Sequence, residues 1–342
     1  MAQTVAKKAA SKKTVAKKTV AKKTVAKKVA AKKTAKPVKG LKRGRAIYDR
    51  SAEDLGNVIA LEHVNVCIPD QRLSTLFYIT GLGLTRDPYL VTSTNNMWVN
   101  AGRTQFHLPT NKPLVVRGTT GIVMPDRAGL LKRLESVKPQ LKGTKFSFKA
   151  ERGYVEATCP WGNRFRIHEP ARRFGRVRLG IVYVEFPVPK GNAAGIARFY
   201  EEIVGAPAKV KTSGGARAAH VAVGYSQELI FRETAGKIAP FDGHHIQIYI
   251  ADFSGPYDKL RARGLISEES NQHQYRFEDI VDLDTGKVLF TLDHEMRSIT
   301  HPLFARPLVN RNPDRSNQMF SPGNEGVSWA LEEPEPAPVP VG

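Results

Sequence analysis

Side chains that can hold a metal ion or a polar ligand recur at every second position in two short apolar segments. They are His63 and Asn65 in residues 61–68, and His245, Gln247 and Tyr249 in residues 245–250. A period of two is typical of a β-strand, so each set shares one polar face opposite an apolar face. Imidazole nitrogens are good ligands for transition metals, and amides both donate and accept hydrogen bonds.

A third segment adds Gln105 and His107, which share one face of a predicted strand over residues 104–108. If that face points inward, His63 and His107 hold a divalent metal, with Gln105 or water completing its coordination, and iron, zinc or nickel suit such ligands. A slip of one residue in the register would turn Phe106 inward instead. A histidine in a strand is more often structural than a ligand, so a purely structural role stays open.

The elements that position these side chains repeat about every 60 residues. Four units begin near Val58, Gly118, Leu179 and Gly243. Each is predicted to form a strand, a turn with a helix cap, an amphipathic helix and two or three further strands. In the first unit, Asp70 is the predicted N-cap, and apolar residues then recur at helical spacing up to the glycines at 81 and 83.

Several of these motifs resemble one protein family. Phe77-Tyr78 precedes Gly-Leu-Gly-Leu at 81–84, and Phe199-Tyr200 precedes Val204-Gly205. These pairs are similar to the helix signature of the vicinal oxygen chelate superfamily, which includes glyoxalase I, extradiol dioxygenases and antibiotic-resistance proteins. The spacing from His63 to Asp70 matches the first strand of that family, and the spacing from His245 to Asp252 is the same. The resemblance covers about 245 of the 342 residues.

The resemblance implies an α+β fold in which four βαβββ modules pair into two glyoxalase-like barrels. We expect residues 56–174 to form the first barrel and residues 175–304 the second. The polar faces of the strands would then line the two interiors. The expected substrate-binding residues are His63, Asn65, Gln105, His107 and Arg166 in the first barrel, and Tyr183, Glu185, His245, Gln247 and Tyr249 in the second.

The metal ligands that the family implies are incomplete at the expected positions. Family members hold a divalent metal with His and Glu from first strands and from last strands, about four residues after a glycine turn. Those positions here are Arg166 and Phe290, and an arginine repels a cation. A pocket around Arg166, His63 and Gln105 that binds a carboxylate or phosphate is therefore one alternative, and an interior without function is another. Glu295 is expected at the rim of the second barrel.

The charge of the chain is concentrated at its start. The chain has 53 Lys+Arg and 32 Asp+Glu, and residues 1–45 contain 17 of the basic residues and no acidic one. Repeats of Thr-Val-Ala-Lys-Lys form no apolar stripe, so we expect a disordered, histone-like tail that binds nucleic acid without reading its sequence. The lysines expected to contact phosphates are Lys7, Lys8, Lys17, Lys18, Lys22, Lys23, Lys27, Lys28, Lys32 and Lys33. Residues 305–342 are expected to form an extended, acidic, proline-rich tail.

These observations bound the function. No run of about 18 apolar residues predicts a membrane span, and two cysteines fit a reducing compartment. We expect a cytoplasmic protein, with nucleoid association, or a nuclear location in a eukaryote, as alternatives. The first hypothesis is a protein that binds a small, anionic organic molecule; if it is an enzyme, which the sequence leaves open, the resemblance implies a lyase or an extradiol-type dioxygenase. The competing hypothesis is a non-catalytic nucleoid scaffold acting through the tail, and a homodimer is left open as a further partner.

Overall fold

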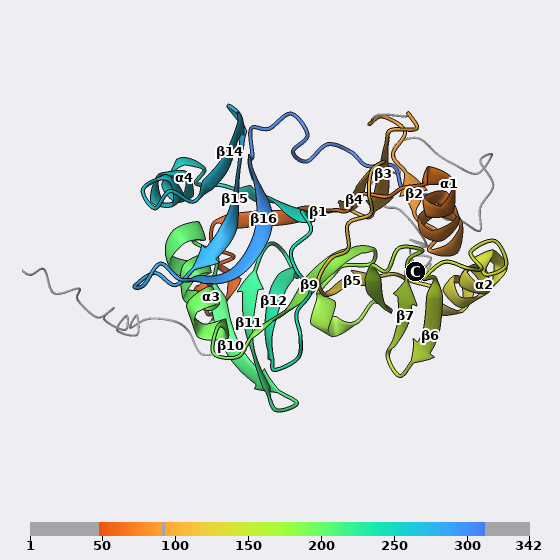
Figure 1. The fold of residues 1–342 in the computed structure, drawn as a ribbon, viewed down its shortest axis with the longest axis horizontal. Helices are drawn as coiled ribbons and strands as arrows, with labels where there is room; N and C mark the ends of the chain where they lie inside the picture. Colours follow the sequence, from red (N-terminus) through yellow and green to blue (C-terminus); the bar gives the residue numbers. More distant parts are fainter. Residues whose placement is uncertain (1–47, 91–92, 312–342) are drawn as a thin grey trace, which may run out of the picture. The chain divides into compact units, whose positions relative to one another are not determined.

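The computed structural model of the protein describes residues 48–90 and 93–311 (Figure 1). Of the described residues, 51–90 and 93–311 belong to one compact unit. The lysines expected to bind nucleic acid, and residues 312–342 of the predicted C-terminal tail, lie outside the described residues. Within the described residues, no helix combines the length and apolar character needed to cross a bilayer.

Four successive modules make up this unit, each a strand, a helix and three further strands. Module 1 contains β1 (Val58–Asn65), α1 (Gln71–Ser74) continued by η2 (Thr75–Gly81), β2 (Thr85–Arg86), β3 (Asn96–Ala101) and β4 (Thr104–Pro109). Module 2 contains β5 (Thr119–Val123), α2 (Arg127–Val137), β6 (Ser147–Glu151), β7 (Tyr154–Thr158) and β8 (Arg164–His168). Module 3 contains β9 (Gly180–Pro189), α3 (Ala193–Phe199) continued by η4 (Tyr200–Val204), β10 (Ala208–Ser213), β11 (Ala216–Ala222) and β12 (Glu228–Thr234). Module 4 contains β13 (His245–Ile250), α4 (Ser254–Arg261), β14 (Ile266–Asn271), β15 (Gln274–Val281) and β16 (Val288–Ser298).

The predicted α+β fold of four βαβββ modules is confirmed. Two short 3-10 helices, η1 (Arg50–Glu53) and η3 (Arg172–Phe174), precede module 1 and join modules 2 and 3. Side-chain caps start two of the module helices: Asp70 Oδ1 accepts the backbone N–H of Leu73 at 3.0 Å, and Asp126 Oδ1 accepts that of Gly129 at 2.9 Å. Both caps satisfy an N–H that has no partner within the helix.

The modules pair into two eight-stranded sheets, and the pairing is not consecutive (Figure 1). Sheet I has the strand order β14-β15-β16-β13-β1-β4-β3-β2 and combines module 1 with module 4. Sheet II has the order β10-β11-β12-β9-β5-β8-β7-β6 and combines module 2 with module 3. The first strands form both junctions, since β1 pairs antiparallel with β13 and β5 with β9.

The expectation that residues 56–174 and 175–304 form separate barrels is therefore wrong. Each first strand gives one edge to the last strand of its own module, as β1 does to β4, and keeps its other edge for a second module. The connection over 169–179 leads β9 back beside β5 in sheet II, whereas those over 110–118 and 235–244 change sheets. Module 1 therefore pairs with module 4, which comes last of the four modules in the sequence.

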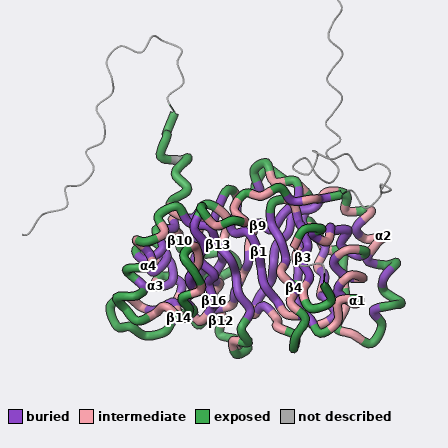
Figure 2. Tube along the Cα trace, turned by 90° about the horizontal axis from the view of Figure 1, so that it is seen from above, coloured by how far each residue is buried: buried purple, intermediate pink, exposed green. Residues whose placement is uncertain are grey.

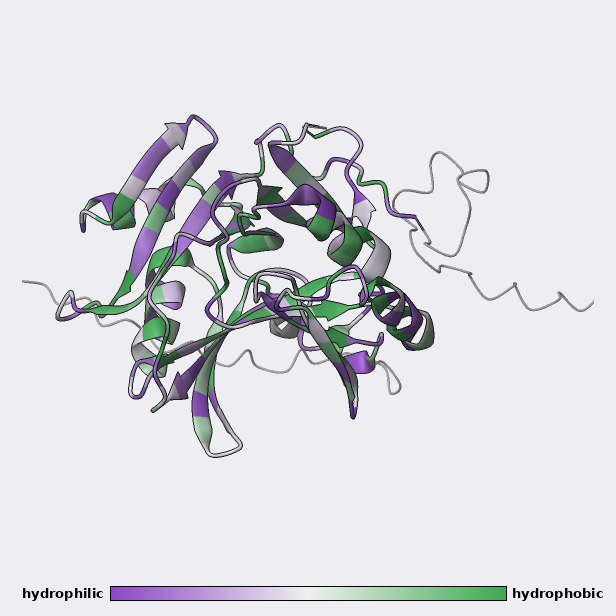
Figure 3. Cartoon of the chain, turned by 45° about the vertical axis from the view of Figure 1, so that its right-hand side comes forward, coloured by the Kyte–Doolittle hydropathy of each residue, from purple (hydrophilic) through white to green (hydrophobic). Residues whose placement is uncertain are grey.

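The apolar faces of the strands pack against the helices. Val64 and Ile248 are buried on sheet I, and Phe165 and Phe186 on sheet II. Apolar and polar residues alternate along many of the strands (Figure 3), and buried positions concentrate in the strands while exposed ones lie mainly in turns and on outer helix faces (Figure 2). The polar faces of the sheets point away from the helices, so their side chains are the candidates for a functional site.

A segment after β16, residues 299–311, returns from module 4 to the edge of module 1; we call it the C-terminal strap. Arg306 Nη2 donates to Asp87 Oδ2 at 2.7 Å, and Asn310 makes two hydrogen bonds to the backbone of Gly102. The Phe304 ring lies 4.9 Å from that of Tyr249. Residues 305–311 of the predicted extended tail are thus docked on the fold.

Candidate metal centre

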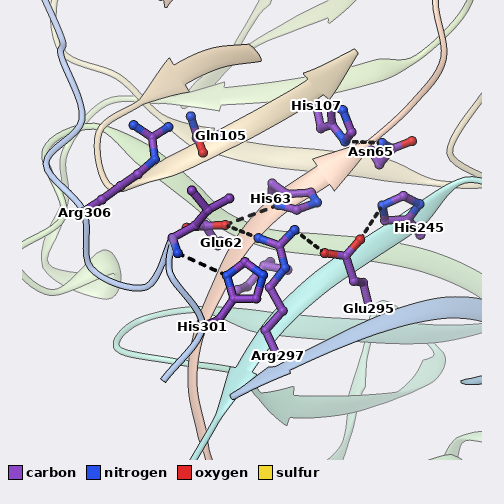
Figure 4. A network of polar contacts seen from close by, with 12 residues as sticks. Glu62, His63, Asn65, Gln105, His107, His245, Glu295, Arg297, His301 and Arg306 are labelled. Atoms are coloured by element: carbon purple, nitrogen blue, oxygen red, sulfur yellow. Dashed lines mark hydrogen bonds and ion pairs between the residues drawn. The ribbon is translucent and has the colours of Figure 1, made fainter. Parts of the chain in front are cut away.

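Four neighbouring strands at the centre of sheet I carry polar side chains that gather in one place: three histidines converge, and a glutamate lies beside one of them (Figure 4). The side chains are Glu295 on β16, His245 on β13, His63 on β1 and His107 on β4. A ligand nitrogen of each histidine lies within 4.8 Å of the other two. Within residues 48–90 and 93–311, no other group of three or more His, Cys, Asp or Glu meets this criterion.

A β-bulge orients the first of these side chains. Residues 61 and 63 of β1 pair with 248 and 247 of β13, so Glu62 is an extra residue. A bulge turns two successive side chains toward similar directions, and Glu62 Oε2 lies 3.4 Å from His63 Nδ1. A carboxylate at Nδ1 favours the tautomer with a proton there and a lone pair on Nε2.

Of the other two imidazoles, that of His107 is also held through Nδ1, whereas that of His245 has only a more distant carboxylate there. The amide nitrogen of Asn65 lies 2.6 Å from His107 Nδ1, and the His107 ring stacks on Trp98 with 3.8 Å between ring centroids. The amide of Asn65 can present either end to Nδ1, and its oxygen there leaves the lone pair on His107 Nε2. His245 Nδ1 lies 3.8 Å from Asp293 Oδ2.

The Nε2 atoms at the centre of the cluster have almost no protein partners. Those of His63 and His107 are buried without a hydrogen bond, and that of His245 has only Glu295 Oε2, at 3.3 Å. Buried polar atoms without partners are rare in folded proteins and require an explanation. Three such nitrogens beside one carboxylate fit a divalent cation of the imidazole-binding type.

The protonation states suit a cation as well. Burial lowers the pKa of His63 well below its usual range, and burial together with the neighbouring His63 lowers the pKa of His107 to about 2. Burial raises the pKa of Glu295, but its hydrogen bond with His245 and the charge of Arg297 outweigh this effect and hold the pKa below its usual range. Neutral imidazoles and an ionised carboxylate are the forms that bind metal.

Two arginines on the same face hold the carboxylate in place. Arg297 Nη2 forms an ion pair with Glu295 Oε1 at 2.6 Å, and Arg276 Nη2 donates to Glu295 Oε2. Arg297 also pairs with Glu62 Oε2 at 3.5 Å, which links the bulge to β16. Burial, opposed by Arg297 and Arg306, raises the pKa of Glu62 to about 7.

The sequence-based site is only partly assembled as expected. His63 and His107 do meet, and His245 joins them because module 4 pairs with module 1. Gln105 instead donates to Asn100 Oδ1 at 2.6 Å and lies beside Arg306, away from the histidines (Figure 4). Gln247 and Tyr249 share the His245 face of β13 and are buried.

Glu295 was expected at the rim and lies at the centre instead. Its position follows the glycine turn at Gly286 by nine residues rather than four, because β16 runs for 11 residues after that turn. The alternation of Asp293, Glu295 and Arg297 along the end of β16 was the signal that could have found it.

Arg166, Tyr183 and Glu185 lie on sheet II, so the expected anion pocket of Arg166 with His63 and Gln105 is not formed. Arg166 Nη1 instead lies 3.6 Å from Glu185, and Tyr183 Oη lies 2.9 Å from His168 Nε2. The Tyr183 ring also fills the space above Gly121, where an added Cβ would be 2.2 Å from it. Sheet II therefore has an aromatic ring at its centre where sheet I has the histidine cluster.

Comparisons with known proteins give structural similarities only. No protein-family model matches the sequence, and no curated protein matches it. A provisionally assigned dioxygenase from Bacillus subtilis is similar at 17% identity and a TM-score of 0.47, over 72% of this chain and 86% of that one. Glyoxalase I from Zea mays is similar at 14% identity and a TM-score of 0.48, over 70% and 92%. A catechol 2,3-dioxygenase is similar at 13% identity and a TM-score of 0.25, over 71% and 93%.

Proposed function

We propose that this chain is a metal-dependent protein of the vicinal oxygen chelate type, with one divalent cation held by His63, His107, His245 and Glu295. The observation that carries the proposal is the convergence of three buried Nε2 atoms, of which two have no hydrogen-bond partner, beside an ionised carboxylate. A cation bound there supplies a Lewis acid that polarises adjacent oxygen atoms of a small organic molecule.

The donor set selects among metals. Three imidazoles and one carboxylate suit zinc, iron or nickel better than magnesium, which prefers oxygen ligands. The expected ligand positions, Arg166 and Phe290, carry no carboxylate, and Glu295 supplies one instead. Arg276 and Arg297 fix the orientation of the Glu295 carboxylate. Glu62 and Asn65 hold the ring planes of His63 and His107, as outer partners of metal ligands do.

Metal titration of the whole chain tests the proposal. After removal of metal by a chelator, calorimetry with Zn²⁺ or Ni²⁺ should give one equivalent per chain. His107→Ala and His245→Ala should each weaken binding by more than about 100-fold, because even outer partners of ligands are worth about 10- to 100-fold. His168→Ala, which removes a buried histidine from sheet II, is the matched control and should leave binding unchanged.

Two results would contradict the proposal. One is failure of the folded, metal-free chain to bind zinc, nickel or ferrous ion. The other is equal loss of binding in the His168→Ala control, which would place the cation elsewhere.

The reaction class is proposed at a coarser level. Lyase activity and extradiol-type dioxygenase activity are the two activities that the resemblance in sequence suggests, and both should require His245. The alternative is a non-catalytic scaffold that binds nucleic acid through residues 1–45, which carry 17 Lys/Arg. It predicts that His245→Ala leaves every function of the protein intact.

A further inference from the structure

The described modules differ strongly in charge. Residues 119–178, module 2 and its connection to β9, contain 14 Lys/Arg and five Asp/Glu. Residues 245–304 of module 4, which has the same fold, contain six Lys/Arg and ten Asp/Glu. Since the fold is the same in both, the excess of basic residues in module 2 is not a requirement of the fold.

Most of the excess lies at one end of the central strands of sheet II, where β8 ends and β9 begins. Five exposed arginines lie there, and we call them the arginine rim: Arg152, Arg172, Arg173, Arg176 and Arg178. Arg166, 37% exposed, adjoins them on β8.

His168 shows that these segments are neighbours. Its Nδ1 lies 3.4 Å from the carbonyl oxygen of Gly153 in the β6–β7 turn and 3.0 Å from Arg173 Nη2. Its Nε2 lies 2.9 Å from the hydroxyl of Tyr183 on β9. The turn that carries Arg152 and the connection that carries the other four arginines therefore lie side by side.

The charges of the rim arginines are not neutralised within the described part of the fold. None of the five makes an ion pair among the residues that the structure describes, whereas the neighbouring Lys149 is paired with Glu151 at 2.5 Å. Arg173 packs over the Phe174 ring at 4.6 Å and contacts His168, whereas the side chains of Arg172, Arg176 and Arg178 make no hydrogen bond or ion pair with the residues that the structure describes. Exposed guanidinium groups with free donors suit phosphate oxygens, which they bind through two parallel hydrogen bonds.

The other connections between modules lack this feature. The connection over 110–118 has Lys112 and Arg117, and Arg117 donates to the backbone of Thr291. The connection over 235–244 has one lysine and one aspartate. Four arginines within seven residues, at 172–178, distinguish the connection that reaches the rim.

We propose that the arginine rim binds the phosphodiester backbone of nucleic acid without reading its sequence. Backbone contacts position a protein on nucleic acid and carry no base information. Tyr225 adds an exposed ring beside the rim, with 53% of its surface accessible and its hydroxyl 3.3 Å from the backbone nitrogen of Arg176. Such a ring can stack on an unpaired base, which only a single strand offers. Single strands and duplexes share the phosphodiester backbone, and the experiment below distinguishes them.

Two other partners fit less well. An anionic membrane surface favours basic residues beside large apolar side chains that insert. Among residues 152–178 no large apolar side chain is exposed, and the neighbouring Tyr225 offers a single ring that carries a polar hydroxyl. A second copy could offer its acidic module 4, but that surface also has paired carboxylates, as in Asp284 with Arg198 at 2.6 Å.

The test uses the full chain with glutamine in place of every lysine and arginine in residues 1–45, so that the tail cannot mask the rim. Fluorescence anisotropy with a labelled duplex and a labelled single strand is recorded from about 50 to 200 mM salt. Binding should persist, with a log–log salt slope of about 0.9 per phosphate contact on the duplex and about 0.7 on the single strand. If the single strand binds more strongly than the duplex, and Tyr225→Ala removes this difference, the backbone that the rim binds is that of single-stranded nucleic acid.

The decisive variant carries Arg172→Gln, Arg176→Gln and Arg178→Gln. Loss of three contacts should lower the duplex slope by up to about 2.7 and weaken binding by at least about tenfold at the lowest salt. The matched control removes three charges from the outside of module 4, with Lys259→Gln, Arg261→Gln and Arg263→Gln, and should change neither value.

Four results would overturn the proposal, and none depends on the metal centre. The first three concern the variants. They are undiminished binding in the rim variant, an equal loss in the module 4 control, and sedimentation showing a dimer that the rim variant dissociates. Tighter binding to anionic lipid vesicles than to either oligonucleotide would also overturn it. Metal binding should be the same in all of these variants, so failure here leaves the proposed function untouched.

Discussion

Replacing Arg306 by alanine should destabilise the protein by breaking the ion pair that docks the C-terminal strap. Arg306 Nη2 lies 2.7 Å from Asp87 Oδ2, and the Asp87 side chain is fully buried while that of Arg306 is 14% exposed. Removing one member of a buried pair leaves an uncompensated charge and costs about 3–5 kcal/mol. Because Asp87 Oδ1 also accepts the backbone N–H groups of Tyr89 and Leu90 at 2.9 Å, we expect the lower end, about 3 kcal/mol.

Urea denaturation followed by tryptophan fluorescence measures this loss, and heating should show a fall in Tm of about 6–12 °C for a unit of this size. The control is the double variant Arg306→Ala with Asp87→Asn, which removes the stranded charge. It should recover more than half of the lost free energy, since the remaining amide is neutral.

The pH dependence gives a second readout. Burial raises the pKa of Asp87, but the hydrogen bond from Arg306 and those from Tyr89 and Leu90 outweigh it and lower the pKa below the usual value. A carboxyl with a depressed folded-state pKa contributes stability above the unfolded pKa, near 4, and loses it as the pH falls through the folded value. The difference between wild type and Arg306→Ala should therefore shrink from pH 7 toward pH 4. A difference under about 0.5 kcal/mol at pH 7, or one that stays constant with pH, would refute the reasoning.

Two further predictions concern the centres of the two sheets. Because burial holds the pKa of His107 at about 2 in the folded chain, the unfolded chain takes up a proton first as the pH falls through 6.5. The metal-free protein should lose about 1.4 kcal/mol per pH unit from this residue between pH 6.5 and 5, and His107→Gln should remove that slope in urea titrations; an unchanged slope would contradict the burial of its ring. Gly121→Ala should destabilise sheet II by about 1–3 kcal/mol because the new Cβ would be 2.2 Å from the Tyr183 ring. Adding Tyr183→Ala should restore part of the loss in the same denaturation assay, and a double variant no more stable than Gly121→Ala would show that the clash is not the cause.

Local patterns in the sequence predicted the modules well. The alternation around Val64 and Ile248 and the cap at Asp70 depend on neighbouring residues alone. Short-range periodicity determines which segments become strands and helices, so these predictions needed no knowledge of the tertiary fold.

The pairing of modules could not be read in the same way. The first strands β1, β5, β9 and β13 each offer a similar edge, and nothing in their residues specifies which other module completes the sheet. The course of the connections determines which two modules share a sheet. Because the connections are irregular, no short-range pattern in the sequence predicts their course. Because the pairing was assigned to consecutive modules, His245 was placed in a different interior from His63 and His107.

The two errors at the site have the same origin. Glu295 was missed because its position was counted from a glycine turn, whereas the length of β16 and its register with β13 bring it opposite Gln247. The carboxylate that seemed absent was therefore present on the other module. A ligand set spread over residues 63 to 295 becomes visible only when the sheet order is known.

The interlaced order of the modules also has a consequence for biosynthesis. Sheet II uses only residues between β5 and β12, so its strands are all present once the ribosome has passed residue 234. Sheet I must wait, because β1 cannot find β13 until the chain has grown by some 180 further residues, and contacts so distant in sequence form slowly. The histidines of the proposed metal centre consequently come together only after sheet II has all its strands. A nascent chain that stalls before β13 has all the strands of sheet II, an unpaired edge on β1 and no His245 beside His63 and His107.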